Sequence, residues 1–247
     1  MTVLASGWGR IGLVAVVAVL GVACGSDEST EIVVSAASSL TRVMVELESQ
    51  FEASHAGVDV VLNVAASSTL RDQVIEGAPV DVFAPADPVH IEAVRTAGIG
   101  TTDPVPFATN RLALAVPRGN PGRVETIDDL SRDELLVGLC AVGVPCGDLA
   151  DRLLEAVGVS ARVDTREADV VALFTKLAAG ELDAGLVYAS DVVSTSEVEA
   201  VEIFEFPANE YRVVVIDDAH PSAAAVAAFL TSDDARRTLA AYGFGLP

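Results

Sequence analysis

Short runs of β-branched residues alternate along the chain with segments whose apolar positions repeat every three or four residues. Residues 31–35, 58–64 and 80–86 have the first pattern, which is typical of buried strands. Helical spacing follows each run, and the first helix carries an apolar stripe made of Leu40, Val43, Met44, Leu47 and Phe51. This alternation predicts an α/β protein with mixed, mostly parallel sheets flanked by helices.

The alternation continues to the end of the chain. Further strands are predicted at residues 111–117, 135–139, 161–165, 183–190, 201–207 and 211–217. Further helices are predicted to begin near residue 67 and to cover residues 88–97, 126–130, 147–157, 168–179, 222–230 and 233–241. The last segment, residues 211–247, holds one strand and two helices, which is too little for a separate core. We therefore expect it to pack back on the first α/β unit.

These elements divide into two α/β units, which predicts a two-lobed protein. We expect lobe 1 to comprise residues 31–109 and 217–247, and lobe 2 to comprise residues 110–216. Two crossover strands, starting near Arg111 and Tyr211, join the lobes. Two lobes joined by a hinge are the usual form of a protein that traps a ligand between them.

The first 24 residues have the pattern of an export signal. Arg10 precedes an apolar stretch, residues 11–23, which is short for a membrane span and ends in small residues before Cys24. Cys24 after Gly-Val-Ala resembles the acylated cysteine of a lipoprotein, although the expected leucine position is occupied by Gly21. An ordinary secretory signal or a single membrane anchor is the alternative. Residues 25–30 form a polar tether, so we expect an exported protein held by lipid on the outer face of the cytoplasmic membrane.

Two cysteines remain after Cys24, and they lie close together. Cys140 and Cys146 are expected to form a disulfide that closes a short loop in an oxidising compartment. Two free buried thiols or a metal site are the alternatives. No histidine or third cysteine lies nearby in the sequence to complete a zinc site.

The formal net charge of −21 narrows the possible partners. Nucleic acids and anionic membranes require a basic patch, and the chain contains a single lysine, Lys176. We therefore expect no nucleic-acid partner. An anionic ligand would have to be held by local dipoles against the field of the whole protein.

Two nearly identical serine-rich turns offer such dipoles. "SAASS" at residues 35–39 and "AASS" at residues 65–68 each follow a predicted strand and precede a helix. A helix N-terminus carries unpaired N–H groups and partial positive charge, and serine adds a hydroxyl donor. Helix capping alone would explain Ser39 or Ser67 taken singly. Their duplication at equivalent junctions favours a shared anion site beyond the carboxyl ends of the strands.

Lobe 2 has matching features. The segments "VPCGDLA" (residues 144–150) and "READVVALF" (residues 166–174) each open a helix and expose further N–H groups. Tyr188 ends a buried strand, where its hydroxyl would face the same edge, although an interfacial core tyrosine is the alternative.

Several of these segments, taken in order, resemble the periplasmic molybdate-binding proteins of the type II solute-binding family. The most specific is "SSTLRDQVIEGAPVDVFAPAD" at residues 67–87. Residues 35–41, 144–150, 168–191 and 242–244 match in the same order and spacing. The resemblance covers essentially the whole mature chain and implies the two-lobed periplasmic-binding-protein fold (type II).

The resemblance also implies a ligand and its contacts. Molybdate or tungstate would be held by the hydroxyls of Ser39, Ser67 and Tyr188 and by the main-chain N–H groups of Val170 and Cys146. The family often has alanine where this chain has Cys146, a change that a backbone contact should tolerate. No cofactor and no metal beyond that of the oxyanion is implied. We expect the protein to be a monomer. The implied partner is the permease of an ABC importer.

Three other functions are alternatives to molybdate binding. Sulfate or another small anion would suit the same fold, since a site made only of donors favours any fully deprotonated dianion over a protonated phosphate. A lipoprotein with a sensory or adhesive role is a further alternative. Catalysis is not expected, because the chain lacks a Gly-x-Ser-x-Gly elbow and its three histidines, His55, His90 and His220, are scattered.

Overall fold

The structure is a computed structural model, and it describes residues 2, 29–193 and 195–247. The predicted export signal with Cys24, and residues 25–28 of the predicted tether, lie outside the described residues. Thr30, also assigned to the tether, is the first residue of a strand. In the described part of the chain, no helix is long and apolar enough to cross a membrane.

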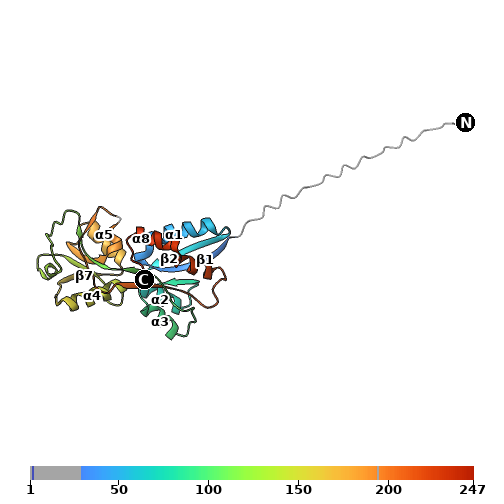
Figure 1. The fold of residues 1–247 in the computed structure, drawn as a ribbon, viewed down its shortest axis with the longest axis horizontal. Helices are drawn as coiled ribbons and strands as arrows, with labels where there is room; N and C mark the ends of the chain where they lie inside the picture. The colour runs from blue at the N-terminus through green and yellow to red at the C-terminus, as the bar shows by residue number, and fades with distance from the viewer. Residues whose placement is uncertain (1, 3–28, 194) are drawn as a thin grey trace.

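Two five-stranded sheets lie in separate lobes, as the sequence predicts (Figure 1). In lobe 1 the strand order is β2-β1-β3-β10-β4, with β1 parallel to β2 and β3, and β10 antiparallel to β3 and β4. The strands are β1 (Thr30–Ala37), β2 (Val58–Ala65), β3 (Val82–Ala84), β4 (Val105–Asn110) and β10 (Asn209–Val215). The helices are η1 (Ser38–Leu40), α1 (Thr41–Ser54), α2 (Ser67–Ile75), α3 (Val89–Thr96), α7 (Ala223–Leu230) and α8 (Asp233–Ala241).

Lobe 2 repeats the plan with the order β7-β6-β8-β5-β9. The strand β6 is parallel to β7 and β8, whereas β5 is antiparallel to β8 and β9. The strands are β5 (Leu112–Pro117), β6 (Val137–Cys140), β7 (Val163–Glu167), β8 (Ala184–Tyr188) and β9 (Val198–Ile203). The helices are η2 (Ile127–Ser131), α4 (Pro145–Val157), α5 (Val170–Ala178) and α6 (Ala189–Val193).

Each lobe has its own apolar core, which explains why the chain forms two bodies. Four residues of the predicted stripe on α1, Val43, Met44, Leu47 and Phe51, are buried in the core of lobe 1. The core of lobe 2 is built around β5, β6 and β8 and includes one residue of lobe 1, Ala66. The two lobes therefore touch near the second serine-rich turn.

The predicted boundary of lobe 2 at residue 216 is wrong. The strand β10 hydrogen-bonds to β3, with Val214 opposite Phe83, and to β4, with Asn209 opposite Asn110. Residues 209–216 therefore belong to lobe 1 with the C-terminal helices. This agrees with the expectation that residues 211–247 pack back on the first unit and contradicts the boundary at residue 216. The strand β4 was not predicted, since Pro106 interrupts its pattern, but proline is tolerated at the edge of the sheet where β4 lies.

The chain crosses between the lobes twice, as predicted, and the crossings lie side by side. One crossing joins β4 to β5 through Arg111, and the other joins β9 to β10 through residues 204–208. Asn110 and Asn209, which border these crossings, are direct partners in the antiparallel β4–β10 pair. The end of this strand pair therefore lies at both connections between the lobes.

Candidate functional site

One small cavity between the lobes is lined by all five of the binding residues that the sequence suggests. The cavity is narrow, with a volume of about 10 Å³, and none of its lining residues is charged. Lobe 1 contributes Ala37, Ser38, Ser39, Ala66, Ser67 and Ala86, and lobe 2 contributes Val144, Pro145, Cys146, Val170 and Tyr188.

The lobe 1 wall is built by two neighbouring parallel strands that run in register. Ala37 at the end of β1 is opposite Ala65 at the end of β2. Two residues further along, the chain reaches Ser39 in one turn and Ser67 in the other. The register therefore places these two serines at equivalent positions, one on each turn.

Neither serine is a helix N-cap. The N-cap residues of η1 and α2 are Ala37 and Ala66, and neither helix has a side-chain cap. Ser67 is buried, and its Oγ accepts a hydrogen bond from the main-chain N–H of Ala86 at 3.0 Å. Plain capping, the alternative explanation of the serine-rich turns, is therefore excluded for both.

In lobe 2, two helices begin at the cavity. The first helical hydrogen bond of α4 runs from the N–H of Asp148 to the carbonyl of Val144, so the N–H groups of Cys146 and Gly147 precede the helical ladder. The helix α5 begins at Val170, after Asp169, whose carboxylate accepts the N–H of Ala172 at 2.9 Å. Both helix starts therefore direct main-chain donors and partial positive charge toward an uncharged space.

The predicted disulfide between Cys140 and Cys146 is confirmed. It joins the last residue of β6 to the second residue of α4, with 5.8 Å between the two Cα atoms. Free thiols and a cysteine metal site are thereby excluded. No group of histidine, cysteine or acidic side chains that could hold a metal occurs among the residues that the structure describes. The disulfide ties the start of α4 to the sheet.

The hydroxyl of Tyr188 completes the cavity at the end of β8. The side chain is almost fully buried, and burial raises the pKa of Tyr188 well above its usual value. The phenol is therefore protonated at neutral pH. Its oxygen accepts a hydrogen bond from Nδ2 of Asn209. Asn209 carried no recognisable signal in the sequence, since its role depends on the chain crossing beside it.

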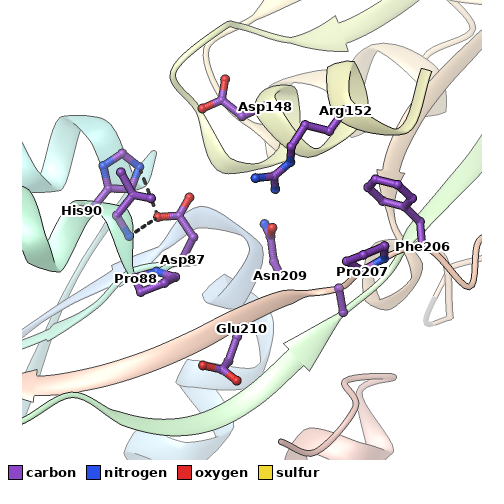
Figure 2. Close-up of a pocket in the computed structure, with 11 residues that line it drawn as sticks. Asp87, Pro88, His90, Asp148, Arg152, Phe206, Pro207, Asn209 and Glu210 are labelled. Atoms are coloured by element: carbon purple, nitrogen blue, oxygen red, sulfur yellow. Dashed lines mark hydrogen bonds and ion pairs between the residues drawn. The ribbon is translucent and has the colours of Figure 1, made fainter. Parts of the chain in front are cut away.

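A larger cleft opens next to the cavity (Figure 2). Asp87, Pro88, Val89 and His90 line it from lobe 1, Asp148 and Arg152 line it from α4, and residues 206–210 form its floor. Figure 2 shows the Asn209 side chain pointing into this cleft between Asp87 and Arg152. The cleft, like the small cavity, is lined by residues of both lobes.

Asp191 in α6 lines another space between the lobes, which is bounded by Arg42 of lobe 1 and by Val171 and Phe174 of lobe 2. Its carboxylate accepts the N–H of Tyr188 at 3.0 Å. Burial raises the pKa of Asp191 to about 7, although that hydrogen bond and the charge of Arg42 act in the opposite direction.

A raised carboxyl pKa makes stability fall as pH rises. Between about pH 4 and pH 7 the folded protein retains a proton on Asp191 that the unfolded chain has lost. We expect the free energy of unfolding to fall between pH 5 and pH 8 by about 2 kcal/mol more in the wild type than in Asp191→Asn. Urea denaturation at both pH values measures this difference, and an equal fall in both proteins would contradict it.

Known proteins resemble this chain over nearly its whole length. The family model described as "Bacterial extracellular solute-binding protein" matches residues 32–245. The molybdate-binding protein ModA of Mycobacterium tuberculosis (strain H37Rv) is 35% identical over 255 residues, which covers 96% of this chain and 97% of the relative. ModA of Escherichia coli (strain K12) is 33% identical over 234 residues, covering 89% and 90%.

Solved structures share the fold. The periplasmic molybdate-binding protein of Azotobacter vinelandii superimposes with a TM-score of 0.72 at 20% identity, over 87% of this chain and 99% of that one. At these identities the likeness concerns the fold alone, and the family rests on the sequence matches. By the family model and by relatives above 30% identity, the chain belongs to the bacterial extracellular solute-binding proteins.

Proposed function

We propose that this chain is the extracytoplasmic binding component of an ABC importer and that it captures molybdate or tungstate in the cavity between its lobes. One observation carries the proposal. The five residues that the family resemblance implies come from five separate segments and line one uncharged cavity. The most similar relatives reported above are molybdate-binding proteins, which supports this ligand.

The proposed contacts are all donors. Ser39, Ser67 and Tyr188 offer hydroxyls, while Cys146 and Val170 offer main-chain N–H groups at helix starts. A hydrogen bond to a charged group contributes about 1.5–3 kcal/mol net. Five such bonds in a closed site support a dissociation constant in the micromolar to nanomolar range, after the costs of ordering and desolvation.

Sulfate is the second candidate ligand. It has the same charge and tetrahedral shape, and the sulfate-binding protein SubI of Mycobacterium tuberculosis shares the fold with a TM-score of 0.72 at 20% identity, over 87% of this chain and 86% of that one. We propose that the metal oxyanion is preferred, because the relatives above 30% identity are molybdate-binding proteins. Catalysis and a resident metal have no part in this proposal.

The cellular setting is also a proposal. Cys24 would be acylated after removal of residues 1–23, and the protein would be held as a monomer on the outer face of the cytoplasmic membrane. Closure of the lobes on the anion would shift an open–closed equilibrium, and the permease would recognise the closed form.

Calorimetric titration of a protein comprising residues 25–247 tests the ligand assignment. Molybdate and tungstate should bind with micromolar or tighter affinity, sulfate more weakly, and phosphate without measurable affinity. A thermal-shift assay with the same four anions serves as an independent readout. No response to molybdate and tungstate in either assay would overturn the assignment.

A further inference from the structure

Two buried asparagines beside the connections between the lobes are linked by hydrogen bonds to the hydroxyls of the cavity. Asn110 and Asn209 are 1% and 3% exposed and lie opposite each other in the β4–β10 pair. Asn209 donates from Nδ2 to the hydroxyl of Tyr188, which belongs to lobe 2. Asn110 donates to the hydroxyls of Ser190 (2.7 Å) and Tyr211 (3.4 Å). Buried polar groups of this kind are costly unless they are paired, so their arrangement calls for an explanation.

The hydrogen bond from Asn209 determines whether the Tyr188 hydroxyl acts as a donor or as an acceptor toward Asn209. An amide NH₂ group can only donate, so the tyrosine oxygen must accept. A phenol has one proton, and that proton is then free for another acceptor. Because the Tyr188 side chain lines the cavity, an oxyanion held there is the acceptor that it can reach.

The serines of the cavity follow the same rule. The Ser67 hydroxyl accepts from the main-chain N–H of Ala86, which can only donate, and so its proton is free for the cavity. Tyr211 accepts from Asn110 and lies 2.9 Å from the oxygen of Ser39. Either hydroxyl can donate in this pair, and when Tyr211 donates to Ser39 the Ser39 proton is left for the cavity. The neighbours of Tyr188 and Ser67 therefore leave both hydroxyl protons for the cavity.

From this arrangement we infer that Asn209 is a positioning residue that determines specificity, because it holds Tyr188 as an obligatory donor to a fully deprotonated oxyanion. The inference rests on the proposed function and adds a residue that does not touch the ligand. Reversing the amide's polarity would turn the Tyr188 proton away from the cavity. The hydroxyl would then present lone pairs, which repel a dianion but accept the proton of a hydrogen-bearing oxyanion.

The variant Asn209→Asp tests the inference, because a carboxylate accepts where the amide donates. We expect molybdate affinity to fall about 100-fold and the ratio of phosphate to molybdate affinity to rise. Part of this loss comes from the added charge alone. Ala208→Asp, which adds a carboxylate to the same cleft from the neighbouring residue, is the matched control and should lose about threefold or less.

A double-variant cycle separates positioning from charge. In a Tyr188→Phe background there is no hydroxyl to turn, so Asn209→Asp should cost only about tenfold there. Asn209→Ala, a second variant without added charge, should cost about tenfold in the wild-type background and nothing in Tyr188→Phe. Equal losses in both backgrounds would overturn the inference, and so would an unchanged ratio of phosphate to molybdate affinity in Asn209→Asp. Circular dichroism verifies that each variant is folded.

The two proposals fail in distinguishable ways. If the wild type binds molybdate but the cycle shows no coupling, only the role of Asn209 is wrong. If the wild type binds neither molybdate nor tungstate, the proposed function fails and the role of Asn209 fails with it.

Discussion

The double variant Ser39→Ala, Ser67→Ala should bind molybdate at least about 100-fold more weakly than the wild type. Each substitution removes one hydroxyl that we propose donates to the anion, and a hydrogen bond to a charged group is worth about 1.5–3 kcal/mol. Two such losses, in a cavity whose lining residues carry no charge, leave only main-chain donors and Tyr188. Calorimetric titration with molybdate measures the effect.

Ser68→Ala is the matched control for this variant. Ser68 follows Ser67 in the same turn but is not among the residues that line the cavity, so its loss should leave affinity unchanged. Ser67→Ala also leaves the N–H of Ala86 without its partner and should cost about 1–3 kcal/mol of stability. Affinity must therefore be measured well below the melting temperature of the variant. An unchanged affinity in the double variant would show that the anion binds elsewhere.

Gly147→Ala should damage both the fold and the site. A Cβ atom at Gly147 would lie 2.1 Å from the carbonyl oxygen of Ala141 and 2.7 Å from that of Cys140. These are main-chain atoms, and Cys140 is held by the disulfide and by a hydrogen bond from Arg166 to its carbonyl. The start of α4 must therefore move away from the sheet. We expect a loss of about 3 kcal/mol in unfolding free energy and about 100-fold in molybdate affinity.

The other end of the same helix provides the control. Gly158 ends α4 with φ of 74°, a conformation that favours glycine, and a Cβ there would meet no neighbouring atom. Gly158→Ala should cost about 1 kcal/mol of stability and leave affinity unchanged. Urea denaturation and calorimetry on both variants separate the two effects. If Gly147→Ala bound molybdate like the wild type, the start of α4 would not form part of the site.

Local patterns predicted most of the fold, and the exceptions have physical reasons. The boundary at residue 216 was wrong because strand pairing is non-local: β10 resembles β5 in sequence, yet it pairs with β3 and β4. The sequence predicts a strand to residue 190, whereas Ala189 begins the short helix α6 (Ala189–Val193), because five residues carry no helical period. The edge strand β4 was hidden by Pro106.

The site was predictable to the extent that it is made of local turns. Ser39 and Ser67 sit at strand-to-helix junctions that can be read from the sequence, and the register of β1 and β2 then brings them together. Asn110 and Asn209 could not be found in this way. They are 99 positions apart in the chain and meet only because the two interlobe crossings run side by side.

The most direct test is a crystal structure of the protein with molybdate, with diffraction recorded at the molybdenum absorption edge. We expect one anomalous peak in the cavity between the lobes. The oxyanion oxygens should lie within hydrogen-bond distance of the hydroxyls of Ser39, Ser67 and Tyr188 and of the N–H groups of Cys146 and Val170. A molybdenum peak outside this cavity, or an empty cavity at saturating molybdate, would contradict it.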